Sequence, residues 1–296
     1  MDMQKELKKR VSEIEEILKQ YLPREEGFQK TVLEAMNYSI LAGGKRLRPM
    51  LMQETYRLFG GETKAIEPFM AAVEMIHTYS LVHDDLPAMD NDEYRRGRKT
   101  THAVYGEAMG ILAGDALLNY AYETAAKAFF MEPGTEAVAQ AFAVLAGKAG
   151  IYGMVGGQAV DVESEGDVSI SKEKLDFIYR LKTGALIEAS MLAGAILAGA
   201  SEEEQRTVEE IAGEVGLAFQ IQDDILDETS SLEVLGKPIG SDKKNQKATY
   251  VAWEGIEKAR EEVERLSADA VEKLHFPSDD HSFLEELLRY LIHREK

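Results

Sequence analysis

The sequence contains no cysteine, which excludes disulfide bonds, thiolate zinc sites and cysteine nucleophiles. It has no run of about 18 uncharged apolar residues, so we expect no membrane span. Residues 1–20 are charged throughout and lack the apolar segment of a signal peptide, which favours a cytoplasmic protein. Positive charge is also scarce, because the formal net charge is −19. This balance argues against nucleic-acid partners, which need a basic surface.

Proline and strand-like patterns are scarce as well. The 296 residues include only seven prolines, and most of them fall at the ends of helical patterns. Apolar residues recur at three- and four-residue spacing in most segments, such as "LDFIYRLKTGALIEASMLAGAIL", whereas alternating patterns typical of strands are absent. Ser201, followed by three glutamates, is predicted to cap a helix. No linker or shift in composition divides the chain, so the sequence predicts a single all-α domain over residues 1–296.

Aspartates gather in two short motifs, each at the C-terminal side of an apolar helical pattern. The motif "DDLPAMD" contains Asp84, Asp85 and Asp90, and the motif "DDILD" contains Asp223, Asp224 and Asp227. Asp223 and Asp227 are four residues apart and share a helix face. Pro87 should end the first helix, so that Asp90 can fold back toward Asp84. Clustered carboxylates repel one another, and hard divalent cations such as Mg²⁺ would compensate them. The alternative interpretation is two solvated acidic helix ends.

Cations gather in several places along the chain. They are Lys45, Arg46 and Arg48; Arg95, Arg96, Arg98 and Lys99; Lys182; and Lys237, Lys243, Lys244 and Lys247. The first set follows Gly-Gly and precedes Pro49, which predicts an anion site at a helix N-terminus. Lys182 stands in an apolar helical pattern, where it must snorkel to solvent or meet an anion. His77 lies nearly on the same helix face as Asp84, although an ordinary core histidine would have the same position.

A series of motifs occurs in order along the chain, namely "GGKRLRP", "HDDLPAMDND", "RRG", "TTH", "GGQ", "KTG", "FQIQDDILD" and "GKPIGSD". These motifs resemble those of the trans-prenyltransferases, the polyprenyl diphosphate synthase family, over roughly residues 30 to 250. The resemblance implies an isoprenoid-synthase-type helical bundle around a central cavity, usually as a homodimer. The two extra residues within "DDLPAMD" resemble the bacterial farnesyl diphosphate synthase subtype.

The resemblance also implies a reaction and a set of site residues. Isopentenyl diphosphate would condense with dimethylallyl and geranyl diphosphate to give farnesyl diphosphate, with about three Mg²⁺ ions per active site stabilising the leaving group. The implied metal ligands are Asp84, Asp85, Asp90, Asp223, Asp224 and Asp227. The implied allylic diphosphate contacts are Arg95, Lys182 and Lys237. The implied isopentenyl diphosphate contacts are Lys45, Arg48, His77 and Arg96. Thr183 and Gln220 would line the reacting end, and Lys247 would help to close the C-terminal loop. The implied catalytic set is Asp84, Asp85, Asp90, Arg95, Lys182 and Asp223.

Product length is expected to depend on the residues before the first motif. Tyr79 lies five residues before Asp84, where a bulky aromatic residue limits growth near C15 in the family. Ser80 beside it is small, so the limit would rest on Tyr79, unless this tyrosine is merely packed in the core. Three alternatives stay open: a geranylgeranyl diphosphate synthase with a C20 product, a class I terpene cyclase, and a non-catalytic helical subunit.

Overall fold

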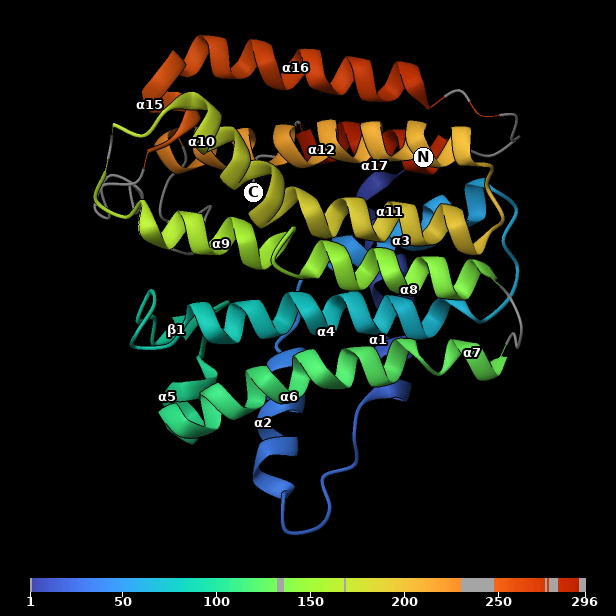
Figure 1. Ribbon diagram of the computed structural model, residues 1–296, viewed down its shortest axis with the longest axis vertical. Coiled ribbons are helices and arrows are strands. Elements are labelled where there is room, and N and C mark those ends of the chain that lie inside the picture. Colours follow the sequence, from blue (N-terminus) through green and yellow to red (C-terminus); the bar gives the residue numbers. More distant parts are fainter. Residues whose placement is uncertain are drawn as a thin grey trace. The chain divides into compact units, whose positions relative to one another are not determined.

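The computed structural model describes residues 2–131, 136–167, 169–229, 248–274, 276 and 282–292. Their regular structure is almost entirely helical, as the periodicity of the sequence predicts (Figure 1). Contacts between residues group the chain into two compact units. Unit 1 comprises Met1–Gln53 and Thr63–Phe142, and unit 2 comprises Glu54–Glu62 and Ala143–Lys296. The single-domain assignment of residues 1–296 stays a prediction.

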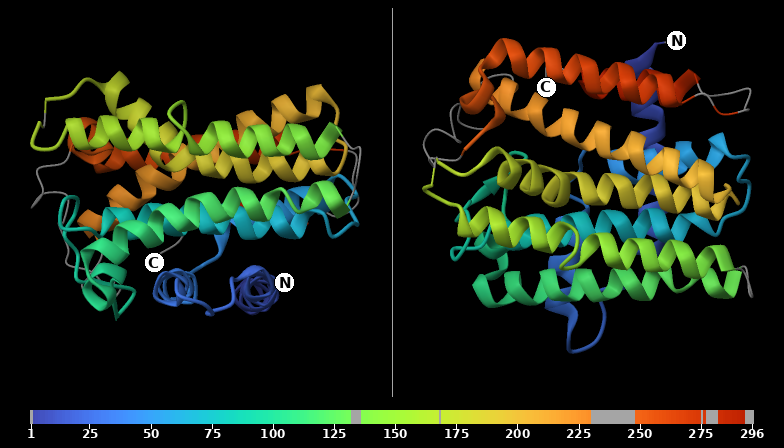
Figure 2. Two further views of the ribbon diagram at one scale, coloured as in Figure 1. Left: turned by 60° about the horizontal axis from the view of Figure 1, so that its bottom comes forward. Right: turned by 45° about the horizontal axis from the view of Figure 1, so that its top comes forward.

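Unit 1 is built around a long buried helix. Its helices are α1 (Met3–Tyr21), α2 (Lys30–Ile40), the start of α3 (Leu47–Leu58), α4 (Ile66–Asp84), α5 (Thr101–Tyr105), α6 (Glu107–Ala125), α7 (Ala128–Met131) and the start of α8 (Glu136–Ala149). α4 is mostly apolar and mostly buried, as expected of a helix in a core, and it lies side by side with α6 (Figures 1 and 2). It ends at Asp84, before Pro87, as predicted.

Unit 1 also contains a short hairpin, which corrects the expectation that strands are absent. β1 (Tyr94–Arg95) pairs with the antiparallel strand β2 (Arg98–Lys99). The two residues between the strands, Arg96 and Gly97, have φ values of 53° and 74°. Positive φ at both central residues is typical of tight hairpin turns, whose twist matches that of the strands. Strands of two residues are too short to show an alternating pattern, so the sequence could not predict them.

Unit 2 contains the remaining helices. They are the end of α3, the end of α8, α9 (Met154–Glu163), α10 (Lys172–Ile178), α11 (Ala185–Leu197), α12 (Glu202–Thr229), α15 (Tyr250–Glu254), α16 (Ile256–Lys273) and α17 (Ser282–Ile292). α12 packs between α11 and α16 (Figures 1 and 2). The predicted cap of α12 is confirmed, because the Glu204 backbone N–H donates to Ser201 Oγ at 3.3 Å. The Ser201 N–H donates in return to Glu204 Oε2 at 2.7 Å, which completes a capping box.

A π-helical turn, η1 (Tyr179–Gly184), joins α10 to α11. The sequence pattern predicts an uninterrupted helix across this segment, so the turn is a finding of the structure. Single π-helical turns within α-helices are rare and often occur at functional sites. The last residue of η1 lies against α12, since a Cβ atom added to Gly216 would lie only 2.7 Å from the Cα of Gly184. Two glycines therefore let the π-helical turn and α12 approach closely.

One stretch, Glu136–Glu163, has the length and mean hydropathy, 1.4, of a membrane-crossing helix. The structure divides this stretch into α8 and α9, with turns at residues 150–153. Length and composition alone are weak evidence, because a helix in the core of a protein passes the same test. The expected absence of a membrane span stays a prediction.

Candidate active site

The first aspartate motif folds back on the end of α4, as its proline predicts. The Asp90 N–H donates to the backbone oxygen of Asp84 at 2.9 Å, and the Asp92 N–H donates to that of Asp85 at 3.2 Å. The Asp85 carboxylate is buried and accepts a hydrogen bond from Arg95 Nε at 2.7 Å. Burial raises the pKa of Asp85, and the nearby Arg95 guanidinium opposes this shift. Asp85 is thus bound to Arg95 within the protein, whereas the Asp90 side chain is exposed.

Arg46 anchors the basic segment before α3. It is 3% exposed, and its guanidinium donates to Glu74 Oε1 at 2.7 Å and to the backbone oxygen of Ile40 at 2.6 Å. Its φ of 49° lies in the left-handed region, which a residue with a side chain adopts only at a cost. Arg46 is thus buried, whereas the neighbouring Lys45 is exposed and Arg48 is partly buried.

The hairpin that carries Arg95 and Arg96 is fixed to α2 by Tyr38. The Arg98 guanidinium lies 4.4 Å from the centre of the Tyr38 ring, which is a cation–π contact. The Tyr38 hydroxyl donates to the backbone oxygen of Lys99 at 2.7 Å. Tyr38 therefore holds β2 directly, and it holds β1 indirectly, because β1 pairs with β2.

His77 lies among arginines in unit 1. Its pKa is lowered well below the usual value of 6.5, first by burial and then by the charges of Arg48, Arg96, Arg95 and Arg46. The imidazole is therefore neutral at neutral pH. An anion bound near these arginines would lower the repulsion between them.

This shift predicts a pH dependence of stability. Below pH 6.5 the unfolded chain binds a proton at His77 that the folded protein does not bind. The free energy of unfolding that the neutral ring contributes is complete above this pH and is lost as the pH falls, by at most about 1.4 kcal/mol per pH unit. Urea unfolding of wild type and His77→Gln, from about pH 7.5 down to about pH 5, should give a shallower slope for the variant. Equal slopes would contradict the prediction.

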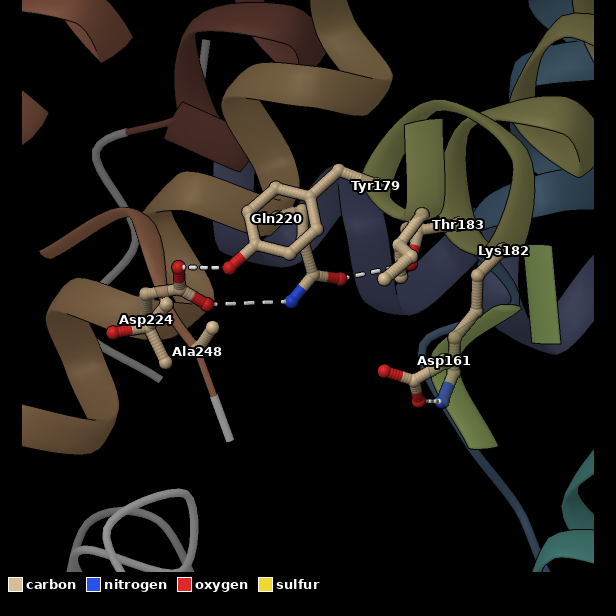
Figure 3. Close-up of a pocket in the computed structure, with 9 residues that line it drawn as sticks. Asp161, Tyr179, Lys182, Thr183, Gln220, Asp224 and Ala248 are labelled. Carbon is tan, nitrogen blue, oxygen red and sulfur yellow. Dashed lines mark hydrogen bonds and ion pairs between the residues drawn. The ribbon is translucent and has the colours of Figure 1, made fainter. Parts of the chain in front are cut away.

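The second group of polar residues lines a pocket of about 110 Å³ in unit 2 (Figure 3). Lys182 Nζ donates to Asp161 Oδ2 at 2.6 Å, in a pair that is partly buried. The Thr183 hydroxyl donates to Gln220 Oε1 at 2.8 Å. The pocket thus places a cation and a hydroxyl group from η1 beside polar side chains of α9 and α12.

The second aspartate motif is divided between solvent and core. Asp223 is exposed, whereas Asp224 and Asp227 are 3% and 6% exposed. Asp224 Oδ2 accepts from the Tyr179 hydroxyl at 2.5 Å and from the Tyr250 backbone N–H at 2.9 Å. Asp223 and Asp224 are adjacent in sequence, so their side chains leave the helix about 100° apart. They therefore meet different surroundings.

Both motifs offer the hard oxygen donors that Mg²⁺ prefers. In the part of the chain that the structure describes, no three acidic or histidine side chains converge closely enough to hold a metal ion alone. Mg²⁺ commonly binds through one or two carboxylates and completes its shell with water and substrate phosphates. The partly exposed Asp84 and the exposed Asp90 and Asp223 fit this mode.

The comparisons with known proteins agree on one family. A family model described as polyprenyl synthetase matches residues 29–287. The chain is 46% identical over 261 residues to a geranylgeranyl diphosphate synthase of Cyanophora paradoxa, covering 88% of this chain and 86% of that protein. It is also 46% identical over 250 residues to a farnesyl diphosphate synthase of Geobacillus stearothermophilus, covering 84% of each. The crystal structure of an FPP/GFPP synthase from Zymomonas mobilis matches with a TM-score of 0.87 at 32% identity, covering 98% of this chain and 99% of that one.

The chain belongs to the polyprenyl synthetase family. This polyprenyl synthetase is an enzyme of isoprenoid biosynthesis, a trans-prenyltransferase, and its all-α fold is that of the family, as the sequence predicts. The terpene-cyclase and non-catalytic alternatives are thereby set aside.

The structure brings most of the expected site residues of the polyprenyl synthetase into two groups, one in each unit. The members in unit 1 are Asp84, Asp85, Asp90, Arg95, Arg96, Arg48 and His77. The members that line the pocket of unit 2 are Lys182, Thr183, Gln220 and Asp224. Lys45 and Asp223 are exposed, and each lies close in sequence to a member of one of these groups. Asp227 is buried in α12. Lys237 and Lys247 lie outside the described residues. The catalytic and binding roles of all these residues stay predictions.

Sequence reasoning missed Asp161 as the partner of Lys182. A signal for it exists, because Asp161 lies four residues after Gly157 of the "GGQ" motif, on the same face of α9. A Cβ atom on Gly157 would lie 2.8 Å from the carbonyl carbon of Leu181 and closer still to the backbone nitrogen of Lys182. The glycine thus allows α9 to press against η1, and one turn later Asp161 reaches Lys182.

Gly157→Ala is therefore expected to separate α9 from η1. The added methyl group meets backbone atoms that cannot rotate away, which costs about 1–3 kcal/mol of stability and weakens the Lys182–Asp161 pair. Urea unfolding measures this loss of stability. The matched control is Gly147→Ala in α8, where nothing lies within 4 Å of the new methyl group. The control should be neutral or slightly stabilising, since alanine favours helix. Equal effects at the two positions would refute this account of Gly157.

Proposed function

We propose that this polyprenyl synthetase is a farnesyl diphosphate synthase. Its relatives include synthases named for farnesyl and for geranylgeranyl products, so product length must come from a feature of this chain. The observation that supports a C15 product is Tyr79, which is 6% exposed and lies five residues before Asp84. Its ring meets that of His83 edge-on, with centroids 5.8 Å apart, so a large side chain is held in a defined position.

Ser80 cannot replace Tyr79 as the limit on chain length. Its hydroxyl donates to the backbone oxygen of His77 at 2.9 Å and therefore folds back on its own helix. A second tyrosine, Tyr122, contributes to the raised pKa of Tyr79, about 12, for which burial is the main cause. The Tyr79 phenol is thus neutral and largely removed from water, as a wall for an isoprenoid chain requires.

Two sets of cations bind the two substrates. Arg95 and Lys182 bind the diphosphate of the allylic substrate, dimethylallyl or geranyl diphosphate. Isopentenyl diphosphate is bound by Lys45, Arg48, His77 and Arg96. His77 is suited to this role, since its neutral ring donates a hydrogen bond without adding to the crowded positive charge. Asp84, Asp90 and Asp223 hold Mg²⁺, which when bound neutralises charge on the leaving diphosphate.

The reaction needs stabilisation of the negative charge on the diphosphate end of the allylic substrate and exclusion of water from its hydrocarbon end. The C–O bond of the allylic diphosphate breaks, giving an allylic cation and pyrophosphate. Arg95 and Lys182 donate hydrogen bonds to the oxygens on which negative charge develops. The double bond of isopentenyl diphosphate attacks the cation, and the proton that is then lost passes to pyrophosphate. Apolar side chains exclude water, which would otherwise capture the cation.

The assembly follows the same proposal. We infer a homodimer, as the resemblance to the family implies. Sedimentation at micromolar concentration should give twice the mass of the 32.9 kDa chain. A monomer there would contradict the dimer without affecting the chemistry.

Product analysis tests the proposal. The purified protein is incubated with Mg²⁺, labelled isopentenyl diphosphate and either dimethylallyl or geranyl diphosphate, and the dephosphorylated products are sized. A dominant C15 alcohol is expected, and none without Mg²⁺. A dominant C20 alcohol would make the chain a geranylgeranyl diphosphate synthase and contradict the proposal.

Tyr79→Ala should shift the product to C20 or longer, because it removes the ring that limits the growing chain. The matched control is Tyr79→Phe, which keeps the bulk of the ring and should keep the C15 product. Unchanged C15 output from the alanine variant would show that another residue limits the chain.

A further inference from the structure

Tyr179, Asp224 and Tyr250 form a buried hydrogen-bond network in unit 2, partly drawn in Figure 3. The Tyr179 hydroxyl and the Tyr250 backbone N–H both donate to Asp224 Oδ2, at 2.5 and 2.9 Å. The Tyr250 nitrogen also lies 3.3 Å from the Tyr179 hydroxyl oxygen. All three residues are at most 7% exposed. Hydrogen bonds to a carboxylate are stronger than neutral ones, and burial strengthens them further.

The network holds one end of the π-helical turn. Tyr179 is the first residue of η1, Asp224 belongs to α12, and Tyr250 begins α15. The other end of η1, Gly184, is pressed against Gly216 of α12. η1 is therefore fixed to α12 at both ends, and Lys182 and Thr183 lie between these two fixed points.

A second chain of hydrogen bonds runs from the same carboxylate toward the reacting residues. Asp224 Oδ1 lies 3.5 Å from Gln220 Nε2, at the outer limit of a hydrogen bond. Gln220 Oε1 accepts from the Thr183 hydroxyl at 2.8 Å. Both oxygens of Asp224 therefore face protein donors that lead back to η1. The adjacent Asp223 is exposed.

We propose that Tyr179 is a positioning residue that acts through Asp224 to hold Lys182 and Thr183 in place for the allylic diphosphate. Asp224 then serves as an anchor of η1 and not as a metal ligand. The inference rests on the proposed role of Lys182 in binding the allylic diphosphate. Under this proposal, the second aspartate motif both contributes to a metal site, through Asp223, and holds the wall of the neighbouring pocket, through Asp224.

The test compares two buried phenols in the protein without substrate. Tyr179→Phe removes the hydroxyl bonded to Asp224, and Tyr56→Phe removes one that is equally buried, at 5% exposure, beside Gly61. Amide hydrogen exchange over 178–184 and 250–254 should accelerate roughly tenfold in Tyr179→Phe, because local opening becomes easier. Tyr56→Phe should leave exchange in these segments unchanged. Equal exchange in the two variants would overturn the proposal.

Steady-state kinetics separate positioning from general damage. In Tyr179→Phe the KM for geranyl diphosphate should rise about tenfold, a factor that corresponds to about 1.4 kcal/mol. The KM for isopentenyl diphosphate, which other cations bind, should stay unchanged. A fall in kcat alone, or an equal rise of both KM values, would indicate a merely structural role and overturn the proposal.

Two variants of Asp224 decide whether it anchors η1 or binds metal. Asp224→Asn keeps an oxygen that can accept from both Tyr179 and Tyr250, so exchange over 178–184 should stay slow. Asp224→Ala should lose this slow exchange. If both variants show the same increase in the Mg²⁺ concentration needed for half-maximal activity, the anchor assignment is wrong. If Lys182→Met leaves the KM for geranyl diphosphate unchanged, the proposed role of Lys182 fails, while the exchange comparison still decides whether Tyr179 holds η1.

Discussion

Replacing Lys182 with methionine is expected to lower kcat/KM for geranyl diphosphate by about a hundredfold or more, the usual loss when one donor to a developing negative charge is removed. Methionine keeps the length and apolar stem of lysine, so packing in η1 changes little. Lys182 Nζ lies 2.6 Å from Asp161 Oδ2 at the edge of the unit 2 pocket, which sets its place before substrate arrives. The measurement is steady-state kinetics with each diphosphate varied in turn.

The matched control is Lys258→Met in the same unit. Lys258 forms a more exposed ion pair, with Nζ 3.1 Å from Glu254 Oε2, outside the pocket. Surface ion pairs contribute about 0–1 kcal/mol to stability, so this variant should keep full activity. Asp161→Asn provides a graded case, because the amide still accepts a hydrogen bond from Lys182 without its charge. Its kcat/KM should fall less than that of Lys182→Met. If kcat/KM of Lys182→Met falls by less than about tenfold, Lys182 does not act at the leaving group.

The sequence predicted the fold where chemistry and periodicity agree. Helical spacing of apolar residues predicted the all-α class, and Pro87 predicted both the end of α4 and the return of Asp90 toward Asp84. The capping box at Ser201 is likewise a local signal that needs no tertiary information. Such features depend on residues a few positions apart, which a single sequence displays directly.

The features that escaped prediction depend on contacts between distant segments. The π-helical turn η1 follows a pattern that is indistinguishable from α-helix over six residues, and its ends are held by Asp224 and Gly216 of α12. The hairpin at Arg96–Gly97 has strands of only two residues, stabilised by Tyr38 from another helix. The pairings of Asp161 with Lys182 and of Tyr179 with Asp224 join residues more than twenty positions apart, which no local pattern displays directly.

Arg46 shows the same limit within a recognised motif. The sequence groups it with Lys45 and Arg48 as one basic cluster, yet the structure gives it a different task. Its guanidinium is buried against Glu74, whereas Lys45 is exposed and Arg48 is partly buried. Within one motif, then, the structure buries one cation against a carboxylate, while we expect its neighbours to bind substrate, and the sequence alone does not distinguish the two.

Glu74→Gln is expected to destabilise the protein by about 3–5 kcal/mol, because it leaves the Arg46 charge buried without its counter-ion. Arg46 and Glu74 side chains are 2% and 3% exposed, and their atoms lie 2.7 Å apart. Glu15, 3.5 Å from Arg46, is itself 36% exposed, so water weakens its compensation. Urea unfolding followed by circular dichroism measures the loss.

Two comparisons show whether burial of the Arg46 charge causes this loss. Glu262→Gln breaks a much less buried pair with Arg265, whose side chains are 26% and 54% exposed and whose atoms also lie 2.7 Å apart, and it should cost less than about 1 kcal/mol. The double variant Arg46→Met with Glu74→Met removes both charges and should be more stable than Glu74→Gln alone, since no uncompensated ion remains. If Glu74→Gln stays within about 1 kcal/mol of wild type, the pair is not the anchor of the basic segment. If instead the double variant folds stably but its KM for isopentenyl diphosphate rises, the charged pair serves to place Lys45 and Arg48 rather than to hold the fold.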